Sequence, residues 1–418
     1  MQETNLSLTF KVRLYPNAIQ AEQFEQVTKE YQQACNIISQ WFFDCYFKVN
    51  RKRFNKEMYY VLKDKFPKLN TAMVQSVYRT VNARYQTVNT QLRKKPLYVP
   101  SGTVDAHGKE KWKPIKRNQL WLQKSIRFKR PQADYLRNTN YRFNQKTNLL
   151  SLNVLSKRIK VSYNTYFKSR LFDKNVKLGT AKLVKACGHW FLHVPYTFVV
   201  NTPEQADFQH IVGIDRGLRF ITTAFDETGK TNFVNGKHLT YVRQKYKHLR
   251  SQLQKRQTSS ARRRLKKIDH RENRYVADIN HQLSKALVDH YGKKTLFVIE
   301  DLSRVRQATK RTKKENRYER VSWPFYDLET KLVYKALNNQ SLVVKVKADY
   351  TSQRCPKCGR INKSNRNHEK HLYVCDRCGY SSNDDRIGAM NIYELGKQWR
   401  SNVENPHFTK LKTDDLNQ

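Results

Sequence analysis

The sequence IVGID at residues 211–215 decides the fold of the carboxyl-terminal half of the chain. Its apolar run predicts a buried strand, and the acidic Asp215 ends that strand. The sequence LFVIE at residues 296–300 has the same form and ends in Glu300. Because open α/β sheets place their sites at the carboxyl ends of their strands, Asp215 and Glu300 are candidate catalytic residues.

The sequence around these two strands predicts an α/β domain over residues 206–350 and 380–400. Its other predicted strands and helices lie at residues 220–225, 232–234, 238–290, 328–337 and 342–346. A third acid, Asp385 or its neighbour Asp384, opens a last helix that carries Ala389 and Ile392.

Three carboxylates that converge in one site need a positive counter-charge. Mg²⁺ accepts a few carboxylates together with water and substrate phosphate. Two such ions, about 4 Å apart, can activate water and stabilise the leaving oxygen of a phosphodiester. An isolated Asp at a strand end is more often a cap or a loop residue. The joint pattern nevertheless favours Asp215, Glu300 and Asp385 as catalytic residues that bind magnesium.

Two CxxC pairs lie between the last predicted strand and the last predicted helix. They read CPKC at 355–358 and CDRC at 375–378, and sixteen residues separate them. This spacing predicts a zinc ribbon over residues 351–379, with one tetrahedral zinc on Cys355, Cys358, Cys375 and Cys378. Four thiolates fill the zinc shell, so we expect a structural site, with His368 and His371 as spare candidates. The remaining cysteines stand alone, and we expect each to be a small buried hydrophobic side chain: Cys35, Cys45 and Cys187.

The amino-terminal half predicts a β-barrel with a helical insertion. Residues 6–14 alternate apolar and polar side chains, as a strand does, and Asn17 with Gln20 resembles a capping pair. Residues 17–45 and 70–94 have helical periodicity, so residues 15–95 form a predicted helical block. Beyond a loop at 96–118, strands are predicted at 119–129, 150–155 and 157–163, with a hairpin at 180–198 that turns at Cys187-Gly188. The barrel would then comprise residues 1–14 and 96–205.

The charge of the chain indicates nucleic acid as its partner. Its 418 residues include 81 Lys and Arg against 35 Asp and Glu, a net charge of +46. The densest basic cluster is predicted to contact phosphate and consists of Arg262, Arg263, Arg264, Lys266 and Lys267. A second basic segment, at 304–320, is a candidate lid. No apolar stretch approaches 18 residues and no secretory signal opens the chain, so we expect a cytoplasmic protein, associated with nucleic acid and not with a membrane. Residues 401–418 are predicted to form a flexible tail.

Together, these motifs resemble those of the TnpB (OrfB) proteins encoded by transposons and of the related type V CRISPR effectors. The resemblance rests on GIDRG at 213–217, IEDL at 299–302, YTSQRCPKCG at 350–359 and DRIGAMNI at 385–392. KVRLYP at 11–16 and KACGHWF at 185–191 are also similar, so the likeness covers nearly the whole chain. Two positions depart from the family pattern: Arg216 stands where an apolar residue is usual, and Ile387 stands where Asn is usual.

The resemblance implies a multidomain α+β protein that cuts DNA at a site chosen by a guide RNA. A wedge-like β-barrel with its inserted helical recognition block would hold the guide RNA and its heteroduplex with target DNA, and would read a short target-adjacent motif. A RuvC-like (RNase H-like) α/β domain with the inserted zinc ribbon would cut the DNA with Mg²⁺. By position, Asp215, Glu300 and Asp385 match the catalytic triad of the family. We expect a monomer with its RNA.

Three other functions remain open from the sequence. A compact type V CRISPR effector would have the same chemistry in a different genetic context. A guide-dependent DNA-binding repressor would not cleave, which the intact acids argue against. A zinc-ribbon RNA-binding protein would explain the charge and the cysteines, but not the acids at the strand ends.

Overall fold

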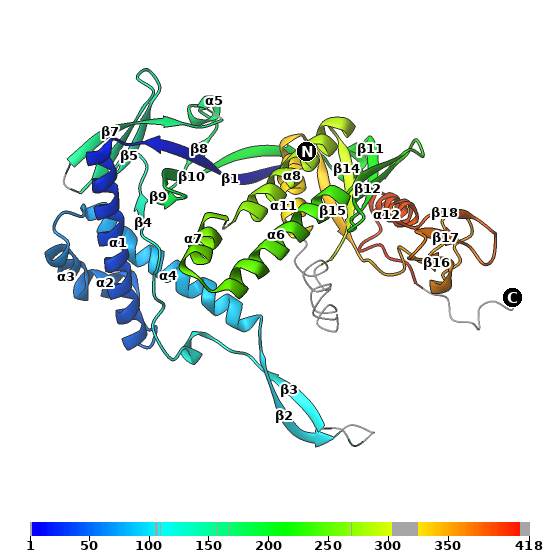
Figure 1. The fold of residues 1–418 in the computed structure, drawn as a ribbon, viewed down its shortest axis with the longest axis horizontal. Helices are drawn as coiled ribbons and strands as arrows, with labels where there is room; N and C mark the ends of the chain where they lie inside the picture. The colour runs from blue at the N-terminus through cyan, green and yellow to red at the C-terminus, as the bar shows by residue number, and fades with distance from the viewer. Residues whose placement is uncertain are drawn as a thin grey trace. The chain divides into compact units, whose positions relative to one another are not determined.

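The computed structural model describes residues 2–104, 108, 110–155, 157–166, 168–268, 270–302 and 325–409. The chain divides into two compact units, Ser7–Phe198 and Met1–Leu6 with Val199–Gln418. Figure 1 shows the elements of both units. The predicted lid at 304–320 and the predicted tail from residue 410 lie outside the described residues.

The helical block of the first unit contains α1 (Ala18–Asp44), α2 (Arg51–Glu57), α3 (Tyr59–Lys65) and α4 (Thr71–Arg93). The helices predicted at 17–45 and 70–94 are confirmed as α1 and α4. The predicted capping pair is also confirmed, because the side-chain oxygens of Asn17 and Gln20 each accept a hydrogen bond from the other residue's backbone N–H. Phe42 is buried and stacks on Tyr85, which joins α1 to α4.

Among the described residues, an eight-stranded sheet follows the path β4-β9-β10-β1-β7-β6-β5, and β8 pairs with β10. Its strands are β1 (Gln2–Tyr15), β4 (Gln132–Tyr135), β5 (Tyr141–Asn144), β6 (Leu149–Val154), β7 (Lys157–Asn164), β8 (Lys177–Leu178), β9 (Ala181–Ala186) and β10 (His189–Thr202). A short helix, α5 (Lys168–Leu171), lies between β7 and β8. The helical block is inserted in the chain between β1 and β4, two strands of the same sheet.

The predicted hairpin turn at Cys187-Gly188 is confirmed between β9 and β10. Both residues have positive φ, 51° and 79°, as a two-residue hairpin turn requires. The prediction that Cys187 is buried is wrong, because a residue at a hairpin tip is exposed to solvent. Cys35 is buried as expected, and Cys45 is half-buried.

The strand predicted at 119–129 is wrong. This segment contains a 3₁₀ turn at Gln119–Trp121 and then crosses α1 and α4. Helix side chains satisfy its backbone: Tyr85 accepts from the N–H of Ile126, and Asn36 accepts from the N–H of Phe128. The loop predicted at 96–118 is instead a two-stranded hairpin of β2 (Leu97–Val104) and β3 (Glu110–Ile115), whose prolines and glycine hid the strand pattern.

The second unit contains a five-stranded mixed sheet in the order β13-β12-β11-β14-β15 within the described ranges. The predicted strands are confirmed as β11 (His210–Asp215), β12 (Phe220–Asp226), β13 (Thr231–Asn235), β14 (Thr295–Glu300) and β15 (Leu342–Val346). The helices are α6 (Lys237–Arg256), α7 (Ser259–Ile268), α8 (Arg271–Tyr291), α11 (Phe325–Asn338) and α12 (Asp384–Arg400). Strand β11 is parallel to β14, and β14 is parallel to β15.

Side chains of the central strands alternate between two cores. Val212, Ile214, Phe297 and Ile299 pack with residues of α8 and α11, whereas Ile211, Leu296 and Val298 pack with residues of α12. Helix α12 approaches β11 closely because Gly213 has no side chain. A Cβ at Gly213 would lie 2.3 Å from the carbonyl oxygen of Ala389 and 2.3 Å from the backbone nitrogen of Tyr393.

The cysteine-bearing segment lies in the chain between β15 and α12. It contains a small sheet of β16 (Arg366–Asn367), β17 (Leu372–Val374) and β18 (Ser381–Asn383). Each CxxC turn is closed by the glycine that follows it: Gly359 donates its N–H to the Cys355 carbonyl, and Gly379 donates to the Cys375 carbonyl. Among the described helices of the chain, none is long and apolar enough to cross a membrane.

Candidate active site and metal centre

Asp215 and Glu300 end two neighbouring parallel strands. Ile214 of β11 is paired with Ile299 of β14, so the next residue of each strand is an acid. Because side chains alternate along a strand, both acids point to the sheet face that α12 covers. The apolar runs in the sequence correctly predicted where each strand ends.

Helix α12 brings a further carboxylate to this edge of the sheet. It begins after Asn383, whose side chain accepts hydrogen bonds from the N–H groups of Asp385 and Arg386. One turn along, a Cβ at Gly388 would lie 3.0 Å from Oδ2 of Asp215. The first turn of α12, which carries Asp385, therefore packs against the Asp215 carboxylate.

Asp385 is buried, Asp215 and Glu300 are half-buried, and burial and like charge shift their pKa values. Burial raises the pKa of Asp215 well above its usual range, and the charges of Glu300 and Asp385 raise it further. Burial also raises the pKa values of Glu300 and Asp385. Such a cluster favours a bound cation or bound protons, because either reduces the repulsion.

Asp384 and Asp385 have different surroundings. The Asp384 side chain is fully buried, accepts a hydrogen bond of 2.9 Å from Nε of Arg366 and lies 3.3 Å from Nδ1 of His371. Asp385 is the one of the two whose charge raises the pKa of Asp215. These contacts favour Asp385 as the third acid of the trio and give Asp384 a structural role at the start of α12.

Arg366 is a functional candidate that sequence reasoning missed. It lies on β16 of the cysteine-bearing segment and reaches Oδ1 of Asp385 through Nη2 at 3.4 Å. Its positive charge lowers the pKa values of Asp215, Glu300 and Asp385, opposing the effect of burial. In the sequence it is one of many basic residues in a segment chosen for its cysteines, so no local signal separated it from surface charge.

Two further side chains hold Glu300 in place. Thr351 donates a hydrogen bond from its hydroxyl to the Glu300 carboxylate. Arg216, whose side chain is buried, donates to the backbone carbonyl of Glu300 and forms an ion pair of 3.2 Å with Glu329. The departure from the family pattern at Arg216 thus has a structural use, because the guanidinium joins the ends of β11 and β14 to α11.

In the described part of the chain, two groups of potential metal ligands have all their ligand atoms within 4.8 Å of one another. One is the four cysteines, and the other is His371 with Asp384 and Asp385. The predicted trio is not such a group. Its carboxylates interact electrostatically without all lying within that distance of one another.

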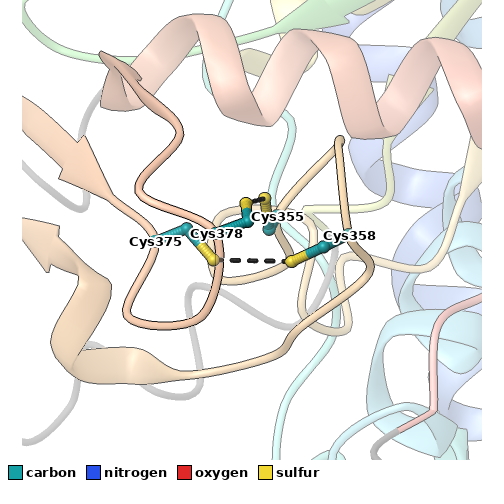
Figure 2. A group of neighbouring side chains, drawn as sticks. All are labelled: Cys355, Cys358, Cys375 and Cys378. Carbon is teal, nitrogen blue, oxygen red and sulfur yellow. Dashed lines mark hydrogen bonds between the residues drawn. The ribbon is translucent and has the colours of Figure 1, made fainter.

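The four cysteines have the geometry of a tetrahedral metal site, and Figure 2 shows their sulfur atoms gathered in one place. The sulfur atoms of Cys355 and Cys378 are 3.6 Å apart, and those of Cys358 and Cys375 are 3.5 Å apart. A tetrahedral zinc with bonds of about 2.3 Å would separate its sulfur ligands by about 3.8 Å. Burial raises the pKa of Cys355 to about 12, so a cation is needed to favour its thiolate. The four residues therefore fit zinc.

The predicted phosphate-binding cluster lies on α7. All five of its basic side chains are exposed along a helix whose Ala261 is buried. The cluster is thus accessible to a polyanion, and its role stays a prediction. His368 is not part of either ligand group described above.

Two family models match the second half of the chain. The model OrfB_IS605, described as "Probable transposase", matches residues 193–312. The model described as "Cas12f1-like, TNB domain" matches residues 325–392, which include the four cysteines, Arg366 and Asp385.

Curated relatives and one solved structure extend this likeness. The chain is 29% identical to the CRISPR-associated endodeoxyribonuclease Cas12f1 of Syntrophomonas palmitatica over 50% of this chain and 43% of that protein. It is 27% identical to the TnpB-like protein MJ0751 of Methanocaldococcus jannaschii over 56% of this chain and 83% of that protein. The chain thus matches less than half the length of this Cas12f1 relative. Its fold is similar to that of the protein in a cryo-EM structure of a Cas12f1–sgRNA–target DNA complex, with a TM-score of 0.54 over 94% of this chain and 99% of that chain, at 12% identity.

Proposed function

Because this chain is related to the TnpB (OrfB) and Cas12f1 proteins, we propose that it is an RNA-guided DNA endonuclease. Its partners would be a guide RNA and target double-stranded DNA with a short target-adjacent motif. The proposal assigns a RuvC-like nuclease to the unit with the five-stranded sheet. It assigns the wedge-like barrel and the recognition block to the unit Ser7–Phe198. The resemblance implies this division of labour, and the net charge of +46 supports nucleic acid as the partner.

One observation carries the catalytic part of the proposal. Asp215, Glu300 and Asp385 lie where two parallel strand ends meet the start of α12, and the charges of Glu300 and Asp385 raise the pKa of Asp215. Glu300 accepts a hydrogen bond from Thr351 and Asp385 is paired with Arg366, yet the charges of both acids still raise the pKa of Asp215. Mutual repulsion in a buried site supports a place for divalent cations.

The residues fit magnesium, since their donors are carboxylate oxygens. Magnesium held by Asp215, Glu300 and Asp385 would supply positive charge for the attacking water and the leaving oxygen of a phosphodiester. Thr351 and Arg216 would keep Glu300 oriented through its carboxylate and its backbone. Arg366 would neutralise part of the charge of Asp385 and offer a guanidinium to the phosphate.

Zinc on Cys355, Cys358, Cys375 and Cys378 would have a structural role. The four thiolates complete a tetrahedral shell and leave no coordination position for substrate. The Arg and Lys residues of α7 would contact phosphates of the bound nucleic acid without reading its sequence.

The decisive experiment measures DNA cleavage and DNA binding separately. The full chain would be expressed with its flanking DNA, and the copurified RNA would be sequenced and reprogrammed to pair with a test duplex. Asp215→Ala, Glu300→Ala and Asp385→Ala should each lower the single-turnover cleavage rate by a factor of about 10³ or more, because each removes a metal ligand. Guided binding, measured by gel shift with calcium in place of magnesium, should change less than about threefold, since it rests on many phosphate contacts.

Asp384→Asn is the matched control, because its amide oxygen can still accept a hydrogen bond from Arg366, and it should retain most activity. If Asp384→Asn is inactive and Asp385→Ala is active, the identity of the third acid is wrong. If all three alanine variants cleave normally, the nuclease proposal fails and a guide-dependent repressor becomes the better interpretation. Transposon ends or a CRISPR array beside the gene would distinguish the two genetic contexts.

A further inference from the structure

The hairpin of β2 and β3 carries several exposed hydrophobic side chains. None of them has a role in the function proposed above. Residues 97–121 contribute seven of the twenty exposed large hydrophobic residues in the described part of the chain. They are Leu97, Tyr98, Val104, Trp112, Ile115, Leu120 and Trp121. Clustered exposed apolar side chains mark contact surfaces, because water disfavours them.

The pairing register sorts these side chains onto two faces. Tyr98 is opposite Pro114, and Pro100 is opposite Trp112, so all four lie on one face, which we term the aromatic face. Tyr98 and Trp112 are each 58% exposed. The other face carries the pairs Leu97–Ile115 and Val99–Lys113. Two aromatic rings and two proline rings thus form an apolar surface, and all four side chains are exposed.

Positive charge surrounds this hairpin. Residues 94–117 contain seven Lys and Arg against two acidic residues. Lys94, Lys95, Lys111, Lys113 and Lys116 are exposed. Nε of Arg117 donates to the carbonyl of Lys95 at 2.8 Å, which ties the two strands together at their base. Figure 1 shows the hairpin extending beyond the end of α4 in the same unit.

A polyanion that also presents flat apolar groups fits both properties, and nucleic acid with unstacked bases is such a ligand. Duplex DNA fits less well, because its base faces are stacked inside the helix. A second copy of the chain fits poorly as well, because each copy carries a charge of +46 and would repel the other. Structured RNA exposes unpaired bases in its loops, bulges and ends, and proteins bind such bases by stacking them on aromatic side chains.

We propose that the aromatic face of the β2–β3 hairpin binds unpaired bases of the guide RNA, and that the hairpin lysines contact its phosphates. This inference depends on the proposed function in one respect, which is that the chain binds an RNA. It names a specific surface for that RNA, separate from the acids of the nuclease-like unit.

The test uses the full chain, freed of RNA at high salt, and a fluorescein-labelled transcript of the RNA that copurifies with it. The double variant Tyr98→Ala/Trp112→Ala should bind this transcript roughly 10- to 100-fold more weakly, because it removes two stacking platforms. The slope of log affinity against log salt should stay unchanged, since the aromatic rings neutralise no phosphate. Lys94→Ala/Lys116→Ala, at the exposed base of the hairpin, should instead make that slope less steep, by about 0.7 for each phosphate that a lysine had neutralised.

The matched control is Leu97→Ala/Ile115→Ala, on the opposite face of the same hairpin, which should change RNA affinity less than about threefold, since it removes no stacking platform. Circular dichroism should show all three double variants folded. Photocrosslinking of a 4-thiouridine transcript should label a peptide that contains Tyr98 or Trp112 in the wild-type protein.

Four results would overturn the proposal. The aromatic variant could bind RNA as tightly as wild type, or the control could lose as much affinity as the aromatic variant. Wild type could be a dimer by light scattering and the aromatic variant a monomer, which would make the hairpin an interface between copies. RNA binding could stay intact while the loaded complex loses affinity for target DNA, which would make the hairpin a DNA contact. Failure of the proposed function is distinguishable, because it would appear as normal cleavage by the Asp215→Ala complex, whatever the hairpin variants do.

Discussion

Gly213→Ala tests whether the close packing of α12 on β11 sets the geometry of the three acids. The added Cβ would lie 2.3 Å from the carbonyl oxygen of Ala389 and 2.7 Å from Cα of Tyr393. Ordinary contacts of carbon atoms are about 3.5 Å or longer, so helix and strand must separate by about 1 Å. These obstacles are backbone atoms, which no rotamer change can move aside.

The expected loss follows from where α12 would move. Ala389 is one turn beyond Asp385, whereas Asp215 is two residues beyond Gly213 in β11, so the separation changes the distance between the two carboxylates. A displacement of this size can reduce an enzymatic rate about 100-fold. We therefore expect single-turnover cleavage by the guide-loaded protein to fall about 100-fold. The substitution should also destabilise the unit by about 1–3 kcal/mol and lower its Tm by several degrees.

Gly396→Ala on the same helix is the matched control. Its added Cβ would meet methyl groups, Cγ2 of Val298 at 2.5 Å and Cγ2 of Ile211 at 3.0 Å, and these side chains can adjust. Gly396 also lies about 16 Å along the helix from Asp385. This variant should lose stability but keep cleavage within about fivefold of wild type, because the acids keep their positions. Wild-type cleavage by folded Gly213→Ala, or equal losses in both variants, would refute the reasoning.

Cys375→Ser should remove most zinc from the purified protein, as measured by mass spectrometry of the metal, and should lower the Tm of the unit with the five-stranded sheet; full zinc content in the variant would contradict the four-thiolate site. Arg366→Ala should slow cleavage about 100-fold and Arg366→Lys less so, since a positive charge is kept; unchanged rates in both would exclude a role for this arginine in the chemistry. Because burial raises the pKa of Asp215, folding favours its neutral form, and stability present at low pH is lost as pH rises through that raised pKa. In EDTA, the Tm should therefore fall as pH increases above about 4, and Asp215→Asn should flatten this dependence; a Tm that rises with pH in wild type would contradict the buried, repelling acids.

The sequence predicted most elements whose hydrophobic pattern is local. Apolar runs that end in an acid located β11 and β14, and the parallel register then brings their last residues together. Asn17 and Gln20 correctly predicted the start of α1, because their side-chain hydrogen bonds need no tertiary contact. These features depend on neighbours in the chain, which a single sequence contains.

The errors arise where distant residues decide the structure. Residues 119–129 have the composition of a strand, but side chains of α1 and α4 hydrogen-bond their backbone in place of a neighbouring strand. Arg366 has no distinguishing neighbours in the sequence, and its importance lies in reaching Asp385 across 19 residues of chain. Cys187 has the residue type of a core position but the backbone conformation of a turn. In each case, the sequence does not reveal which distant segment of the chain packs against the residue in question.

The cysteine-bearing segment can influence the acids although its metal site has no open position for substrate. Thr351, four residues before Cys355, holds the Glu300 carboxylate, and Arg366 reaches Asp385 from within the segment. Asn391 of α12 donates hydrogen bonds of 2.8 Å to the carbonyls of both Thr351 and Arg354, which fixes the entry of the segment against the helix that carries Asp385. Metal binding that orders the CxxC turns would therefore also order the contacts of two acids on different elements. A structural metal at this position in the chain would stabilise the spacing between Glu300 and Asp385, since the segment is hydrogen-bonded to both.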